Sequence, residues 1–266
     1  MISKMMSEHL LEKLDHSQIK GLENIGNRFL NQSFDPQNKY SIPYFWGTLG
    51  IVYNTELVKT APKHWSDLWR PEYKNSIMMI DGAREVMGVG LNALGYSLNS
   101  KNTKQLQEAV DKLYTLTPNI KAIVADEMKG YMIQNNAAIG VSFSGEARQM
   151  LEKNDKLRYV VPTEASNLWF DNIVIPKTVK NKKAAYQFIN FMLKPENAAK
   201  NSEFIGYATP NAKAKELLPE ETTSDEQFYP DLESFGGRAE VYQDLDPKML
   251  QLYNDLFLKF KINNRK

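Results

Sequence analysis

The chain has 266 residues, enough to bury a large core and long enough for two lobes. Its formal net charge of +1 excludes a nucleic-acid binder that works through a general basic field. It has no cysteine, so disulfides, thiolate catalysis and zinc–cysteine sites are excluded, and its three histidines (His9, His16 and His64) lack metal-ligand spacing. We therefore expect neither a metal nor a cofactor.

Apolar residues recur at the spacing of helices and strands in a series of short segments. Taken in chain order, the predicted elements are a helix over 2–14, a strand over 50–54, a short helix over 64–69, a strand over 76–80, a helix over 81–94, a helix that carries Leu106, Val110 and Leu113, strands over 120–125, 137–143, 157–161 and 168–175, a helix that carries Ala185, Phe188, Ile189 and Met192, and a last helix that carries Met249, Leu252, Leu256 and Phe260. Gly95, Pro118 and Pro195 mark helix ends.

This alternation of strands and helices predicts an α/β fold, with helices layered on largely parallel sheets. The stretch 219–243, rich in Glu, Asp, Gly and Pro, is predicted to be the least regular part. The chain has no G-x-G-x-x-G and no Walker motif, so a nucleotide-binding α/β fold has no positive support. His64, at the start of a short helix, is expected to be a surface or capping residue.

The strand 168–175 carries an aromatic ring and a carboxylate at alternate positions. Trp169 and Asp171 are two residues apart, so on an extended strand they point to the same face. The face of an indole ring attracts an ammonium group, and a carboxylate neutralises it. Such a pair suits a ligand that is cationic and partly aliphatic.

Five motifs together carry a family likeness. They are WFDNIVIP at 169–176, DGAREV at 81–86, YSIPYFWG at 40–47, SDLW at 66–69 and IGYATPN at 205–211. In these motifs the chain resembles the polyamine-binding receptors of ABC importers. The likeness runs in order, nearly without gaps, from residue 1 to about residue 230. Each motif is weak alone, but together they are specific.

The resemblance implies a two-lobed α/β periplasmic-binding-protein fold of type II, in which the ligand cleft lies between the lobes and closes about a hinge. Lobe 1 would comprise 1–47 and 171–215, and lobe 2 would comprise 48–170 and 216–266. Family members begin with a signal sequence and a first βαβ segment that carries part of the ligand site. The resemblance therefore also implies that this chain lacks its N-terminal segment and that lobe 1 is incomplete.

The resemblance places the family's central amine-binding acid at Asp171, and a wall for the ligand's methylene chain at Trp169. Without the resemblance, Asp171 would be a solvent-exposed acid on an edge or at the end of a strand, and Trp169 a core residue. Because apolar residues lie on both sides of Asp171, we expect it to be buried, and a buried carboxylate needs a partner. No Lys or Arg is near in the sequence, so a ligand ammonium is the expected partner.

At the start of the helix over 81–94, the family has an acidic pair that binds a terminal amine. Glu85 matches one member of the pair, whereas the other falls on Gly82. Asp81 therefore serves only if its side chain replaces the missing acid. From the residues alone, Asp81 is a helix N-cap and Glu85 suits the helix dipole, and Arg84 is a structural counter-ion instead of a ligand contact.

Three further residues match ligand-site positions of the family. Phe143 lies between a predicted strand and a helix, where the family often has Trp, and it is otherwise a core residue. Tyr207 matches a tyrosine that lines the cleft, and it is otherwise a turn residue with its hydroxyl in water. Gln243 matches a glutamine that contacts an amine, in a stretch that aligns only with a shift.

The resemblance thus implies a binder and not an enzyme. The receptor would capture spermidine or putrescine and deliver it to the membrane permease and ATPase subunits of an ABC importer, with no nucleic acid as a partner. It would be periplasmic, or anchored at the cell surface as a lipoprotein in Gram-positive bacteria, although no signal sequence stands at the start of this chain.

Three other functions remain open. The first is a receptor of the same fold for another small solute, which competition between spermidine and maltose or ferric iron would separate. The second is a glycoside hydrolase that uses Asp81, Glu85 and Asp171 as its acid and base. The third is an interaction module without a small ligand, which would show no thermal shift with any amine.

Because the segment implied to be missing carries aromatic and hydroxyl contacts in the family, we expect the 266-residue chain to bind polyamines weakly or not at all. The unpaired sheet edge and apolar surface left behind would also lower its solubility. Calorimetric titration of putrescine and spermidine into this chain, and into a version extended upstream, measures the difference. Tight binding by the 266-residue chain would contradict this expectation.

Overall fold

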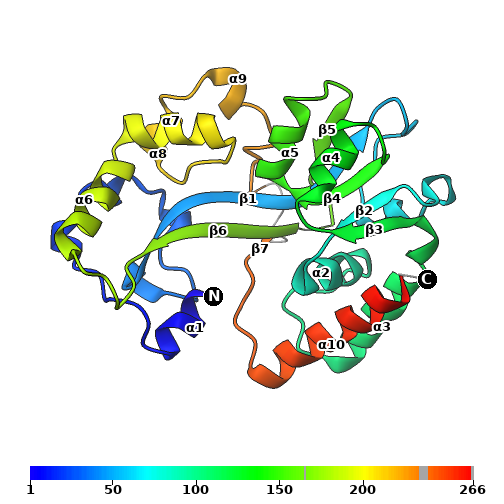
Figure 1. The fold of residues 1–266 in the computed structure, drawn as a ribbon, viewed down its shortest axis with the longest axis horizontal. Helices are drawn as coiled ribbons and strands as arrows, with labels where there is room; N and C mark the ends of the chain where they lie inside the picture. Colours follow the sequence, from blue (N-terminus) through cyan, green and yellow to red (C-terminus); the bar gives the residue numbers. More distant parts are fainter. Residues whose placement is uncertain (165, 234–238, 265–266) are drawn as a thin grey trace. The chain divides into compact units, whose positions relative to one another are not determined.

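The computed structural model describes residues 1–164, 166–233 and 239–264 (Figure 1). The chain forms two compact units, which are unit 1 (Met1–Gly47 and Trp169–Tyr229) and unit 2 (Thr48–Leu168 and Pro230–Lys266). Two strands, β1 (Ser41–Asn54) and β6 (Ser166–Val174), each have residues in both units. β1 starts earlier than the predicted strand over 50–54, and most of its residues are buried.

The segment 216–229 belongs to unit 1, whereas the family resemblance implies that it lies in lobe 2. Its last residue explains why. The Tyr229 ring packs edge-on against Trp46 with 6.0 Å between the ring centroids, and its hydroxyl accepts a hydrogen bond from the Thr209 N–H. The other expected boundary, at Asp171, lies close to the start of the second segment of unit 1 at Trp169.

Unit 2 is built on a mixed sheet with the strand order β3-β2-β4-β1, and β5 also pairs with β1. Besides β1, its strands are β2 (Ile77–Ile80), β3 (Ile120–Val124), β4 (Ile139–Phe143), β5 (Leu157–Val160) and β7 (Ala239–Glu240), of which β7 lies parallel to β6. β2 runs parallel to β3 and β4, but β1 runs antiparallel to β4 and β5. The expectation of a largely parallel sheet therefore holds only for part of it, since periodicity reveals a buried strand but not its direction.

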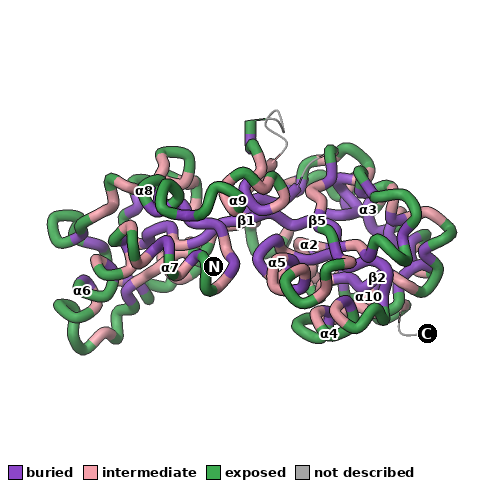
Figure 2. Tube along the Cα trace, turned by 90° about the horizontal axis from the view of Figure 1, so that it is seen from above, coloured by how far each residue is buried: buried purple, intermediate pink, exposed green. Residues whose placement is uncertain are grey.

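The helices of unit 2 pack against one another and against the sheet (Figure 1). They are α2 (Ala83–Ala93), α3 (Thr103–Tyr114), α4 (Glu127–Ile133), α5 (Ser144–Leu151) and α10 (Pro247–Asn263). Trp65, Tyr253 and Phe260 are wholly buried in this core, and each such side chain stabilises the fold by roughly 1.5–3 kcal/mol. Figure 2 shows β2 largely in the purple of buried residues.

The helices of unit 1 are α1 (Ile2–Ser7), α6 (Lys182–Met192), α7 (Pro195–Ile205), α8 (Ala212–Lys215) and α9 (Glu220–Thr223). Short 3-10 helices lie at His16–Gln18, Leu22–Asn24, Asn27–Phe29 and Pro36–Asn38 in unit 1, and at Trp65–Trp69, Pro71–Tyr73 and Thr117–Asn119 in unit 2. Tyr186 and Ile189 bury the inner face of α6 in a core that also contains Ile42 and Ile175. The prediction that Phe188 shares this face is wrong, because it lies on the opposite side of the helix and is 57% exposed.

The predicted helix over 2–14 is wrong beyond its first turns. α1 ends at Ser7, and His9 has a left-handed backbone with φ of 55° that no α-helix continues. Leu11 then forms an antiparallel bridge to Pro176, and the Glu12 N–H donates to Ile175 O at 2.8 Å. Leu11 is buried beside this segment, which follows the end of β6, so its apolar side chain reaches a core from a strand-like segment and not from a helix.

The length and polarity of the helices decide whether any of them could span a membrane. α10, with 17 residues, is too short and too polar to span a bilayer. Among the described residues, no other helix has the length and apolarity that a crossing requires. The stretch 219–243 contains, in its described part, only the short elements α9 and β7, as its composition predicts.

Gly50 of β1 has no room for a side chain. A Cβ atom there would lie 2.5 Å from Val160 O and from the Tyr159 hydroxyl. We expect Gly50→Ala to force β5 away from β1 and to lower the free energy of unfolding by about 1–3 kcal/mol, measured by denaturant titration. Gly130→Ala in α4 is the control, because a Cβ there meets nothing within 4 Å, and it should leave stability unchanged or slightly higher. Equal destabilisation by both variants would contradict the steric argument.

Candidate functional site

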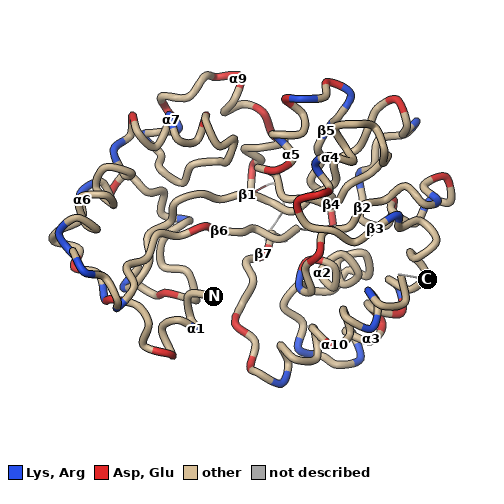
Figure 3. Tube along the Cα trace, viewed as in Figure 1, with Lys and Arg blue, Asp and Glu red and all other residues tan. Residues whose placement is uncertain are grey.

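Strand β6 brings Trp169 and Asp171 to one face, as their spacing predicts, while Phe170 points to the other. The expectation that Asp171 is buried is wrong, because its side chain is exposed. Apolar neighbours did not bury it because a strand turns alternate residues to opposite sides. Figure 3 marks the single acidic position along β6 in red.

Among the described residues, no positive charge lies beside Asp171 to offset the cost of its partial desolvation. Desolvation by the surrounding protein raises the pKa of its carboxyl above the usual value, and no hydrogen bond or cation in the described structure opposes that rise. Several other acids have a cationic partner: the Glu12 carboxylate, for example, pairs with Lys177 and Lys182, with the nearer lysine at 2.9 Å. An unpaired, partly desolvated carboxylate is a group prepared for an external cation.

Aromatic rings extend from Trp169 across unit 1. The Trp169 and Tyr207 rings meet edge to face with 5.4 Å between centroids, and Tyr207 meets Phe45 of β1 in the same way at 5.6 Å. Tyr207 is placed by Gly206, whose φ of 82° ends α7 and turns the chain. The expected tyrosine is thus beside the expected tryptophan, although the two lie far apart in the sequence.

A second row of rings lies on the opposite side of the same strands. Phe170 packs edge-on against Phe29 at 5.8 Å, and Phe29 lies 5.3 Å from Trp46. Two aromatic pairs at adjacent positions, 45–46 and 169–170, therefore send one ring to each face. Adjacent aromatic residues at both positions are the sequence signal that predicts two such rows.

Glu85 lies in the first turn of α2, as expected, and is half-buried. Burial raises the pKa of its carboxyl, while its own backbone N–H and the Arg84 charge act in the opposite direction. Burial has the largest effect, so Glu85 shares with Asp171 a raised pKa that no ion pair among the described residues compensates. Both acids match ligand-site positions of the family, and Asp81, the conditional third acid, differs from them because it has an ion-pair partner.

The prediction that Asp81 caps α2 is wrong. The N-cap residue is Gly82, which has no side chain to offer, and Asp81 instead forms an ion pair with Lys261 of α10. A ligand ammonium at Asp81 would have to displace that lysine. The competing cation comes from 180 residues further along the chain, which is why local sequence does not reveal it.

Arg84 ties the start of α2 to two other segments of unit 2. Its guanidinium donates to Asn99 Oδ1 at 3.0 Å and to Leu98 O at 3.2 Å, and it lies 4.4 Å from the centre of the Tyr242 ring. Tyr242 has a buried hydroxyl, and burial together with the Glu85 charge raises its pKa well above the usual value. Arg84 is thus a structural residue, and Tyr242 is a neighbour of the site that sequence reasoning missed.

Phe143 and Gln243 also lie in unit 2. Phe143 is the last residue of β4 and precedes α5, as expected, and it packs partly buried against the unit 2 core. The Gln243 backbone is held by Asn99, which accepts its N–H at 2.8 Å, while its side chain is exposed. The structure therefore gives Gln243 a fixed backbone and a side chain directed to solvent.

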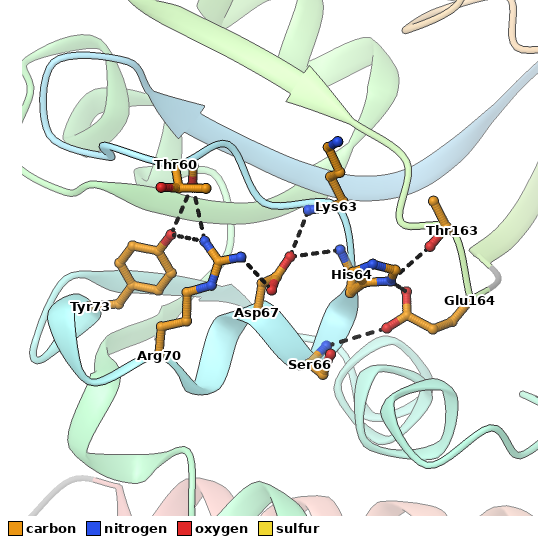
Figure 4. Close-up of polar contacts among 9 residues, drawn as sticks. All are labelled: Thr60, Lys63, His64, Ser66, Asp67, Arg70, Tyr73, Thr163 and Glu164. Atoms are coloured by element: carbon orange, nitrogen blue, oxygen red, sulfur yellow. Dashed lines mark hydrogen bonds and ion pairs between the residues drawn. The ribbon is translucent and has the colours of Figure 1, made fainter.

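Another polar cluster of unit 2 surrounds His64 (Figure 4). His64 precedes the 3-10 helix Trp65–Trp69 and forms a capping box with Asp67, which confirms it as a capping residue. Its Nδ1 lies 2.8 Å from Thr163 Oγ1, and Asp67 also binds Arg70 at 2.6 Å. These groups satisfy one another, and no group of three His, Asp or Glu side chains in the described residues has the arrangement of a metal site.

The sequence matches a family of known proteins along most of its length. A model of the bacterial extracellular solute-binding proteins matches residues 1–230. The chain is 36% identical over 262 residues to the spermidine/putrescine-binding periplasmic protein of Salmonella typhimurium, covering 98% of this chain and 74% of that protein. Against the protein of the same name from Escherichia coli K12, identity is 35% over 258 residues, covering 93% and 74%.

A solved structure extends the likeness to the fold. It is that of a spermidine/putrescine ABC transporter substrate-binding protein from Streptococcus pneumoniae, 71% identical in sequence, with a TM-score of 0.93 over 99% of this chain and 81% of that one. This similarity confirms the α/β fold of a periplasmic binding protein that the sequence motifs predict.

Asp171 is expected to reduce the stability of the ligand-free protein. Because its folded-state pKa is raised, the carboxyl favours folding while protonated, and this contribution is lost as pH rises through the folded-state pKa. Asp171→Asn should raise the free energy of unfolding at pH 7 by less than about 1 kcal/mol, since solvent screens the exposed group. At pH 3, below the unfolded value of about 3.9, it should have no effect. Destabilisation in denaturant titration at pH 7 would contradict this account.

Proposed function

The chain belongs to the bacterial extracellular solute-binding proteins, and from this premise we propose that it is a polyamine receptor. It captures spermidine or putrescine and delivers it to an ABC importer. Members of this family bind solutes and do not transform them, so the protein is not an enzyme. The relatives named above carry the same pair of ligands in their names.

The observation that supports the proposal is the Asp171 carboxylate, which has a raised pKa, no cation beside it among the described residues, and the Trp169 ring on the same face. An ammonium group supplies the missing charge and donates hydrogen bonds to the carboxylate. The indole and Tyr207 rings cover the methylene groups next to that ammonium and attract its charge. A neutral sugar would leave Asp171 uncompensated.

Glu85 is the second acid of the proposal. It is half-buried with a raised pKa, so it too gains from an external cation. A polyamine has at least two ammonium groups, and we infer that Asp171 and Glu85 each bind one. Phe143, Tyr207 and Gln243 are proposed to contact the same ligand, whereas Asp81 joins it only by releasing Lys261.

The magnitudes suit a receptor. Each charge-assisted hydrogen bond contributes about 1.5–3 kcal/mol, and each cation–π contact about 0.5–2 kcal/mol. Two or three of each, less the cost of ordering the ligand, approach the roughly 8 kcal/mol of a micromolar complex. Removing one acid is therefore expected to weaken binding by about tenfold to a hundredfold.

The relatives from Salmonella and Escherichia are named periplasmic, which supports a location outside the cytoplasm for this protein. We infer that its partners are the membrane permease and the ATPase subunits of an importer, and that it is either periplasmic or held at the cell surface by a lipid anchor. Cell fractionation with and without lipoprotein-processing inhibitors separates the last two.

Calorimetric titration of spermidine and putrescine into the protein in its gene-encoded length tests the proposal. Asp171→Asn should weaken binding of both amines by about tenfold to a hundredfold, because it removes one charge-assisted hydrogen bond. Asp155→Asn, which alters an exposed acid in unit 2, is the matched control and should bind like the unaltered protein. Binding of maltose but of neither amine, or equal losses in both variants, would overturn the proposal.

A further inference from the structure

Gly82 lies directly against the carboxylate of Glu85. A Cβ atom built on Gly82 would fall inside van der Waals contact of Glu85 Oε2 and 2.9 Å from Glu85 Cδ. The backbone of Gly82 is extended, with φ of −148° and ψ of 125°, a conformation that any residue adopts. Its conformation therefore gives no reason for glycine at this position, and what glycine provides is space.

The Glu85 carboxylate uses that space. It bends back over the first turn of α2, where its own backbone N–H stabilises the charged form, and the partial positive charge of the helix N-terminus acts in the same sense. In this position the carboxylate is withdrawn against its helix instead of extending from it. A larger residue at position 82 is incompatible with the withdrawn position.

The backbone around Gly82 has little freedom to make room. Arg84, two residues on, is held by Asn99 Oδ1 and Leu98 O and lies over the Tyr242 ring. One turn further, Leu98 packs closely on the helix, since a Cβ atom on Gly88 would lie 2.9 Å from Leu98 Cδ2. With the first turns of α2 fixed by these contacts, a side chain at position 82 moves the Glu85 carboxylate and not the helix.

We propose that Gly82 is a specificity-determining residue: by leaving room for the withdrawn Glu85 carboxylate, it sets the receptor's preference among linear amines of different length. This inference rests on the polyamine-receptor function proposed above. The ammonium groups of putrescine and spermidine are separated by different lengths of chain. The position of one of the acids that bind them therefore changes the two affinities unequally.

The test is a set of four proteins: the unaltered protein, Gly82→Ala, Glu85→Gln and the double variant, each titrated with putrescine and with spermidine. Gly82→Ala should change the ratio of the two dissociation constants by about threefold or more, and in the Glu85→Gln background it should change the ratio by much less. Gly130→Ala, which adds the same methyl group in open space, should leave the ratio unchanged. An unchanged ratio in Gly82→Ala, or an equal change in both backgrounds, overturns the inference.

A measurement without ligand separates this inference from the proposed function. Carbon-13 NMR of the Glu85 carboxyl follows its titration in the unaltered protein and in Gly82→Ala. In Gly82→Ala the Glu85 carboxylate moves toward solvent and loses part of the desolvation that raises its pKa. Its pKa should therefore fall in the variant. If neither amine binds but the pKa falls, the polyamine function fails while the steric role of Gly82 stands. An unaltered pKa refutes that role whatever the ligand.

Discussion

The proposed capture of a polyamine depends on the Asp171 carboxylate of β6, a charge that the described protein leaves uncompensated. A strand places it beside Trp169, the surrounding protein desolvates it, and no described cation neutralises it. Desolvation without a partner is unfavourable in the free protein. The same arrangement becomes favourable once a cation arrives, because the charge of the cation stabilises the carboxylate. Binding energy is thus prepared in advance at a cost to stability.

Acids elsewhere in the chain show what compensation looks like. Asp35 is only 1% exposed, yet it accepts hydrogen bonds from the N–H groups of Lys39, Tyr40 and Ser41, each within about 3.0 Å. Asp81 is paired with Lys261. The fold can therefore satisfy a carboxylate where it needs to, and this contrast gives weight to the lack of a partner at Asp171.

Sequence reasoning located the important side chains but not their surroundings. Strand periodicity placed Trp169 and Asp171 on one face, because that relation depends only on two residues in one element. It failed for the burial of Asp171 and for the role of Asp81, because both depend on residues from distant parts of the sequence that pack nearby. Tyr242 was missed because it lies in an irregular stretch without periodicity and meets α2 from more than 150 residues away. Local sequence patterns do not reveal such long-range contacts. Only a resemblance to a family of known fold can indicate them.

The most direct test is a carbon-13 NMR titration of the Asp171 carboxyl in the gene-encoded protein, with and without saturating spermidine. The account predicts a pKa above the usual value of aspartate in the free protein and a marked fall when the amine binds, because the ammonium stabilises the charged form. An ordinary or lowered pKa in the free protein, or a raised pKa that spermidine leaves unchanged, would contradict it.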